Sequence, residues 1–113
     1  MKEAMVICPQ RDNDGHGLGH VKHYAVLSMC KAFGGCTVSS AQGTWEAPDG
    51  TLVTEPVWQL VSAYDEADKA NDAKLTSVAL YIGHEGKQQA VYTRYASGEV
   101  AILDTYTAQQ KAA

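Results

Sequence analysis

The sequence contains no apolar run that approaches the roughly 20 residues of a membrane-spanning helix. Its first residues, MKEAMVICPQRDNDG, also lack the long apolar core of a secretory signal peptide. A chain of 113 residues can form one modest hydrophobic core and not two. We therefore expect a soluble, cytoplasmic protein with a single domain at residues 1–113 and a polar C-terminal tail from about residue 104.

Clustered basic residues are missing as well. The nine Lys and Arg residues are scattered along a chain with thirteen Asp and Glu residues, and the net charge is −4. Binding to nucleic-acid phosphates needs clustered Lys and Arg. We therefore expect no nucleic-acid partner, and no membrane partner because no segment is suited to a bilayer.

Cysteine is scarce, and the three cysteines (Cys8, Cys30 and Cys36) form no CxxC pair. An odd number without this spacing is typical of buried thiols in a reducing compartment, not of a disulfide framework. A Cys–His nucleophile would need a cysteine beside a histidine. Cys8 and Cys30 lie in apolar segments, so only Cys36, which follows two glycines, is a candidate reactive thiol.

Hydrophobic periodicity predicts the elements of the first third of the chain. The apolar run at residues 4–9 predicts a buried strand. The loop at residues 10–17 is rich in turn-forming residues, and Asp14 is placed to cap the next helix. From Leu18 to Phe33, apolar residues recur at steps of three and four, which predicts an amphipathic helix that stops at Gly34-Gly35.

A long hairpin is predicted next, with strands at about residues 36–47 and 51–63. Its turn is Pro48-Asp49-Gly50, because Pro presets φ, Asp bonds the nearby backbone and Gly accepts a positive φ. Pro56 cannot donate a ladder hydrogen bond, so it predicts an edge, a bulge or a gap in pairing. The second strand is apolar at positions of both parities, so we expect helices on one of its faces and another subunit on the other.

A second helix and a final hairpin complete the chain. Acidic residues open the helix, where they complement its dipole, and Gly83 or Gly86 ends it. The final hairpin turns at Ser97-Gly98 between residues 88–95 and 99–103. The acidic residues at the helix start are Asp65, Glu66 and Asp68.

This order of elements predicts an α+β fold. It reads strand, helix, two strands, helix, strand, with an additional edge strand, which is a ferredoxin-like sandwich with an antiparallel sheet and two helices on one face. Nothing in the chain would cover the other face of the sheet. Association with copies of the same chain is the usual remedy for such a face.

Three histidines lie close together in HGLGHVKH. His16, His20 and His23 are spaced by four and three residues, so a helix can place them on one side and bind zinc. Against zinc binding, glycines lie at the helix start and no acidic general base stands between the histidines as in HExxH. A solvated helix face is the alternative, and we expect no metal in the functional site.

The glycine-rich loop before the first helix matches neither GxGxxG nor GxxxxGK[ST]. Residues 11–17 nevertheless lead into a helix N-terminus, whose N–H groups can bind a carboxylate or phosphate. Arg11 is therefore a candidate substrate-binding residue, with a purely structural loop as the alternative.

Trp45 and Glu55 lie on the two facing strands of the predicted hairpin. Trp is costly to leave exposed, and a strand carboxylate between Thr54 and Pro56 is hard to explain as part of a core. An aromatic face beside a carboxylate suits a cationic ligand, through cation–π and ion-pair attraction. The alternative is a Trp that caps the core and a surface Glu on an edge strand.

The same hairpin carries a resemblance to a known family. The stretch GGCTVSSAQGTW, followed by DG and VTEPV, has the spacing FGG-T-…-G-W-…-G-…-E found in small phage-encoded proteins. It most resembles the phage S-adenosylmethionine lyases (SAM lyases, also SAM hydrolase-like). The resemblance covers the helix end at Phe33-Gly34-Gly35, the hairpin with Trp45 and Gly50, and Glu55, and the later run QQAVYTRY also fits.

The resemblance implies a ferredoxin-like subunit of a homotrimer with active sites between subunits. The implied reaction splits S-adenosylmethionine into 5′-methylthioadenosine and homoserine lactone without water, in the cytoplasm of the phage's host. Glu55 would be the functional glutamate on the strand after the turn, Trp45 the aromatic residue that lines the site, and Tyr92 a further substrate-binding residue. The substrate's own carboxylate can attack its γ-carbon, so no protein nucleophile and no cofactor is needed.

A hypothesis from another class uses the same residues. The chain would then be a non-catalytic oligomeric binding module of phage origin, whose groove holds a small ligand or a host protein. Binding of a ligand without formation of a product distinguishes this module from the lyase.

Overall fold

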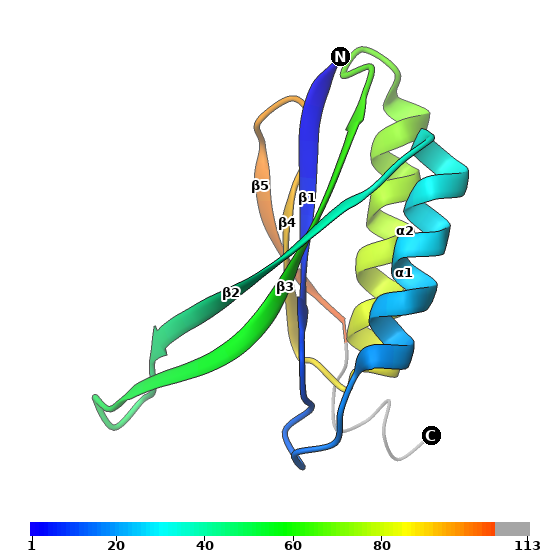
Figure 1. Cartoon of the computed structure of the whole chain (residues 1–113). Helices are drawn as coiled ribbons and strands as arrows, with labels where there is room; N and C mark the ends of the chain where they lie inside the picture. The colour runs from blue at the N-terminus through cyan, green and yellow to red at the C-terminus, as the bar shows by residue number, and fades with distance from the viewer. Residues whose placement is uncertain (106–113) are drawn as a thin grey trace.

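A computed structural model of the chain describes residues 1–105, which form five strands and two helices (Figure 1). In chain order these elements are β1 (Lys2–Pro9), α1 (Gly19–Phe33), β2 (Thr37–Glu46), β3 (Leu52–Tyr64), α2 (Lys69–Glu85), β4 (Ala90–Arg94) and β5 (Val100–Asp104). Neither α1 nor α2 combines the length and the hydrophobicity that crossing a bilayer requires.

The strands form one antiparallel sheet in the order β2-β3-β1-β4-β5. Both helices lie on the same face of this sheet, and no element among residues 1–105 covers the other face (Figure 1). The first four strands have the ferredoxin-like order, and β5 adds an edge strand beside β4. The predicted α+β sandwich is confirmed.

The core lies between the sheet and the two helices. Side chains alternate between the faces of a strand, so Ala4, Val6 and Cys8 of β1 face the helices and are fully buried. The helices contribute their apolar stripes to the same core, as the periodicity predicts. The fully buried helix residues are Val21, Ala25, Met29, Leu75, Ala79 and Ile82.

The helix ends show which capping predictions were right. Gly34 ends α1 in the left-handed region at φ 91°, as predicted, and Gly86 rather than Gly83 ends α2. The Asp68 carboxylate caps α2 by accepting from the Ala70 N–H at 3.0 Å. The Asp14 cap was wrong: α1 begins at Gly19 after Leu18, with no side-chain cap.

The start of α1 is fixed by the sheet instead of by a carboxylate. The Leu18 N–H donates to the Gln10 carbonyl at 2.9 Å, and the Gln10 N–H donates to the Pro56 carbonyl at 3.1 Å. The loop is therefore closed across its base by backbone bonds. The same arrangement explains Pro56, because the Gln10 carbonyl that would face its missing N–H already accepts from Leu18. This is the predicted gap in pairing.

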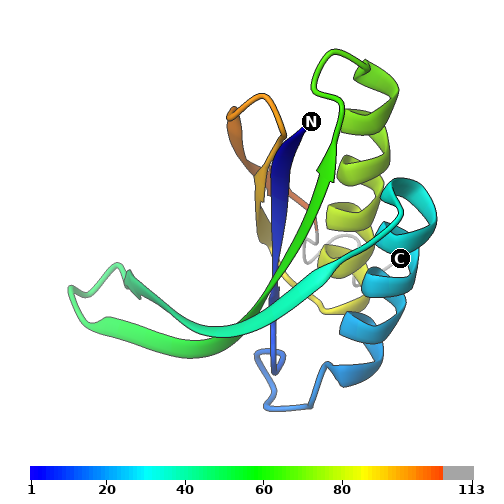
Figure 2. The ribbon, with the colours of Figure 1, turned by 45° about the horizontal axis from the view of Figure 1, so that its top comes forward.

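The β2–β3 hairpin extends beyond the rest of the sheet as an arm (Figures 1 and 2). Pairing between β1 and β3 ends at Pro9 and Val57, so residues 52–56 pair with β2 alone. We call residues 42–56 the hairpin arm. Gly50 turns its tip at φ 87°, as the Pro-Asp-Gly signal predicts.

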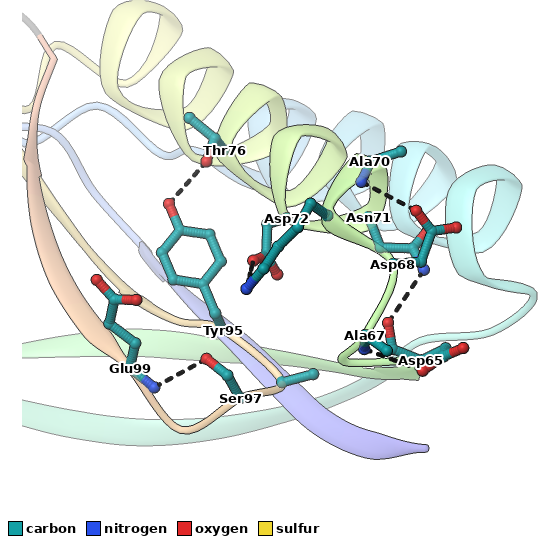
Figure 3. A network of polar contacts seen from close by, with 12 residues as sticks. Asp65, Ala67, Asp68, Ala70, Asn71, Asp72, Thr76, Tyr95, Ser97 and Glu99 are labelled. Carbon is teal, nitrogen blue, oxygen red and sulfur yellow. Dashed lines mark hydrogen bonds and ion pairs between the residues drawn. The ribbon is translucent and has the colours of Figure 1, made fainter.

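Polar contacts tie the start of α2 to the end of β4 (Figure 3). The Thr76 and Tyr95 hydroxyls lie 2.7 Å apart. The Tyr64 hydroxyl donates to Asp72 at 2.7 Å and accepts from the Ala96 N–H at 3.2 Å. These bonds join the end of β3, the turn after β4 and helix α2 on one side of the core.

The C-terminal tail was predicted from about residue 104, and residues 106–113 of it lie outside the described residues. Asp104 is instead the last residue of β5, and Thr105 is buried. The Thr105 hydroxyl donates to the Gln88 carbonyl at 2.6 Å, which ties the end of β5 to the end of α2.

Candidate functional site

The uncovered face of the sheet carries a groove of about 680 Å³. Its floor is apolar and comes from residues of β1 and β3 that alternate with the core residues, such as Met5, Ile7 and Val57. The hairpin arm forms one wall, and β4 and β5 contribute the other. The wall residues used below are Gly43, Trp45, Glu55, Gln88, Tyr92 and Ile102.

Trp45 and Glu55 face this groove from opposite strands of the hairpin arm. In the register of β2 and β3, Trp45 pairs with Val53 and Glu55 pairs with Gly43. The two side chains are thus diagonal neighbours on one face, within reach of a shared ligand. The Trp45 side chain is 47% exposed, so it does not cap the core.

The Glu55 carboxylate is half-buried in the wall of the groove. Within residues 1–105, no hydrogen-bond donor or cationic side chain pairs with it, and burial raises its pKa above the usual value for glutamate. A carboxylate in this state gains from any ligand that brings a positive charge or donor groups. Glu55 is therefore available for a ligand.

A second hollow of about 480 Å³ adjoins the groove and shares Trp45 and Glu55 with it. Three carboxamide side chains, those of Asn13, Gln88 and Gln89, line this hollow. Sequence reasoning missed them because they come from two loops far apart in the chain. The alternation in β1 would have identified Met5 and Ile7 as residues of the uncovered face.

Tyr92 lies in the groove, on β4 and opposite Ile102 of β5. The structure therefore brings three of the four predicted site residues to one surface. Arg11 is the exception. Its guanidinium donates to the Gly15 carbonyl at 3.3 Å within its own loop, and it does not line the groove.

The three histidines do not converge. His16 lies in the loop, 3.3 Å from an Asp12 carboxylate oxygen, while His20 and His23 are on α1. The cluster of potential metal ligands among residues 1–105 consists of Asp12, Asp14 and His16. Within residues 1–105 the three histidines considered as a zinc site are thus not brought together, and the cluster lies in the loop of Asn13, which lines the hollow beside the groove.

The cysteines are not activated for nucleophilic chemistry. Burial raises the pKa of the Cys8 thiol to about 12. Burial also raises the pKa of the Cys36 thiol, the candidate reactive one. Both groups are therefore protonated thiols near neutral pH, so the raised pKa does not favour Cys36 as a reactive thiol.

Two solved structures share this fold. One is a phage SAM lyase in complex with S-methyl-5′-thioadenosine, with a TM-score of 0.69 and 16% sequence identity, covering 91% of this chain and 88% of that chain. The other is a phage SAM lyase in its apo state, with a TM-score of 0.68, 15% identity and the same coverage. The sequence matches no protein-family model and no curated protein. At these identities the similarity shows the fold, and the expected ferredoxin-like fold of the phage SAM lyases is confirmed.

Proposed function

We propose that this chain is an S-adenosylmethionine lyase that acts in the cytoplasm of a phage-infected host. The observation that carries the proposal is the Glu55 carboxylate, which has no partner within residues 1–105 and lies beside the half-exposed Trp45 ring in the groove. The fold shared with a lyase that holds S-methyl-5′-thioadenosine supports the same conclusion.

The chemistry suits this groove, whose lining among residues 1–105 includes no cysteine, serine or histidine. In S-adenosylmethionine, a carboxylate oxygen of the substrate forms a bond to its own γ-carbon. The bond from that carbon to the sulfonium breaks, and its electron pair returns to sulfur. The products are 5′-methylthioadenosine and homoserine lactone, and no water is consumed. The protein has to hold the substrate in a near-attack geometry, which can contribute about 7–11 kcal/mol in favourable intramolecular reactions.

The groove residues fit separate parts of this substrate. Glu55 would accept hydrogen bonds from the substrate's ammonium group or ribose hydroxyls. These bonds would also offset the cost of burying the Glu55 carboxylate. Trp45 would stack on the adenine ring, since offset aromatic stacking is favourable at a half-exposed indole. Tyr92 would line the opposite side. Arg11 is left out of the proposed site because it does not reach the groove.

We further propose a homotrimer with its sites between subunits. Apolar residues on the uncovered face remain accessible, including Val100 at 48% and Ile102 at 61% exposure. A neighbouring subunit on this face would bury them and close the groove around the substrate.

Incubation of the purified protein with S-adenosylmethionine, followed by chromatography for 5′-methylthioadenosine, tests the proposed reaction. We expect product with the wild type, a large loss in Glu55→Gln and a smaller loss in Trp45→Ala. Glu46→Gln is the matched control, because Glu46 ends β2, the strand that pairs with the strand of Glu55, and does not line the groove. Full activity in Glu55→Gln would refute the role of the carboxylate.

The non-catalytic binding module makes the opposite prediction in the same experiment. It predicts that 5′-methylthioadenosine or S-adenosylmethionine raises the melting temperature while no product forms. That result would refute the lyase proposal and support the binding module.

A further inference from the structure

We propose that Gly43 determines which ligands the groove admits, because its missing side chain leaves the space above Glu55. This inference rests on the proposed function of the groove and adds a residue to which no role has been assigned. Gly43 lies in the middle of β2, within the hairpin arm, and its position is directly opposite Glu55 in the β2–β3 register.

The pairs on the groove face of the hairpin show what is unusual about this position. Ser39 pairs with Gln59, and the Ser39 hydroxyl donates to the Gln59 side chain at 3.1 Å. At the groove-face pair nearer the hairpin tip, Trp45 and Val53, both strands carry a side chain. Only at Glu55, among the four groove-face pairs from Ser39 to Trp45, does the facing residue have no side chain. The carboxylate is thus open to the groove where a cross-strand neighbour would ordinarily lie.

The backbone does not require a glycine here. Gly43 is absent from the glycines with positive φ, which are Gly15, Gly34, Gly50 and Gly98. A Cβ at position 43 would meet only Val57 Cγ1, at 3.6 Å, which is ordinary van der Waals contact. A methyl side chain would therefore fit here without a close contact among residues 1–105.

Glycine in the interior of a strand has an energetic cost, because it loses more backbone entropy on folding and has no side chain to pack. Such glycines often mark a place where a ligand or another backbone approaches closely. Within residues 1–105, no backbone atom of another segment lies within 4 Å of a Cβ added at Gly43. The space beside Glu55 and Trp45 is therefore room for a ligand, and larger side chains at position 43 would exclude it.

The test compares Gly43→Ala and Gly43→Val with the wild type. Three quantities are measured: turnover of S-adenosylmethionine, affinity for 5′-methylthioadenosine by calorimetry, and melting temperature. We expect affinity and turnover to fall at least about tenfold in Gly43→Val and less in Gly43→Ala, since a single misplaced methylene in a pocket changes discrimination by about 10- to 200-fold. The melting temperature should stay the same or rise in both variants.

Gly35→Ala and Gly35→Val are the matched controls. Gly35 precedes the same strand, has no atom within 4 Å of an added Cβ and lies outside the groove. These variants should keep wild-type affinity and turnover.

The outcomes separate this inference from the proposed function. Wild-type turnover that persists in Gly43→Val would overturn the role of Gly43 and leave the lyase intact. Methylthioadenosine binding without turnover, lost in Gly43→Val, would overturn the lyase and support the role of Gly43. A wild type that neither binds nor reacts would overturn both.

Two further results would also count against Gly43 as a specificity residue. A lower melting temperature in both variants would show that the fold itself needs glycine. A change in oligomer mass in Gly43→Val would assign the space to subunit packing.

Discussion

At the scale of single residues, Glu55 is the side chain that the fold explains least. Within residues 1–105 this half-buried carboxylate has no partner, and burial disfavours its charged form and raises its pKa. Burial of a group that gains nothing within its own chain is typical of functional sites. Trp45 is also unfavourably placed in the isolated chain, because much of its large indole stays exposed in the hairpin arm.

The pH dependence of the protein's stability should report the cost of burying the charged Glu55 carboxylate. A carboxyl whose pKa is raised by folding stabilises the folded state at acidic pH, and this contribution is lost as the pH rises through the raised pKa. Glu55→Gln should therefore be at least as stable as the wild type at neutral pH, and relatively less so at acidic pH. Melting temperatures across this range check the prediction, and a variant that is clearly less stable at neutral pH would contradict it.

The pH dependence of turnover follows from the same shift in pKa. If the ionised carboxylate binds the substrate, kcat/KM should fall on the acidic side, with a midpoint above the usual pKa of glutamate. The fall should be absent from the residual activity of Glu55→Gln. An acidic limb that is identical in both proteins would assign the titration to another group.

At the scale of elements, α2 and the end of β5 are closely interlocked at Gly83. An added Cβ at Gly83 would overlap the side chain of Thr105. Replacement of a helix glycine by alanine ordinarily gains about 1 kcal/mol, but overpacking costs about 1–3 kcal/mol. We expect Gly83→Ala to lower the free energy of unfolding, by up to about 2 kcal/mol from these two effects.

Urea denaturation of Gly83→Ala measures this loss directly. Gly35→Ala provides the control, because it makes the same chemical change where nothing lies within 4 Å of the new Cβ. A Gly83→Ala protein as stable as the wild type would show that the end of β5 can move away at little cost.

The Tyr64 hydroxyl links β3, α2 and Ala96 in the turn that follows β4. Its loss in Tyr64→Phe leaves the Asp72 carboxylate and the Ala96 N–H without this partner, which should cost about 1–3 kcal/mol. Burial raises the pKa of Tyr64 from 10.0 to about 12. The stability that the neutral hydroxyl supplies is present below pH 10 and lost as the pH rises to about 12.

Chemical denaturation of Tyr64→Phe at neutral pH and at pH values approaching 12 checks both statements. The gap in stability between wild type and variant should narrow as the pH rises. Tyr24→Phe is the control, because Tyr24 is 54% exposed and its change should have little effect. A constant gap would show that Tyr64 does not titrate differently in the folded protein.

The sequence predicts the helices and strands far better than it predicts how they pack and pair. Periodicity and turn residues predict both helices and the long hairpin, because these signals are local. The Asp14 cap failed because a tertiary bond, from Leu18 to Gln10, decides where α1 begins. Glu55 and Trp45 could be singled out as misplaced residues, whereas Gly43 became informative only when the register placed it opposite Glu55.

At the scale of the whole molecule, the uncovered face of the sheet carries the candidate site and the surface available for assembly. Both helices cover the same face of the sheet (Figure 2). The other face carries the groove and exposed apolar residues. The order of the strands, which the element order predicts, is what gathers β1, β3 and β4 beneath this groove. The carboxamides of the adjoining hollow could not be predicted, because their proximity depends on how two loops meet.

The uncovered face predicts an assembly. We expect a homotrimer in solution, measured by light scattering or sedimentation, and a shift towards monomer when Ile102→Lys places a charge among the exposed apolar residues. Lys87→Glu, on an exposed turn outside the groove, is a control that should leave the mass unchanged. A monomeric wild type would contradict a site shared between subunits.

The proposed reaction in the groove is an intramolecular cleavage of S-adenosylmethionine. Reaction in water labelled with heavy oxygen, followed by mass spectrometry of the early products, tests this claim most directly. The account predicts 5′-methylthioadenosine together with homoserine lactone that carries no oxygen from the solvent. Absence of methylthioadenosine, or homoserine with solvent oxygen in its hydroxyl group, would contradict it.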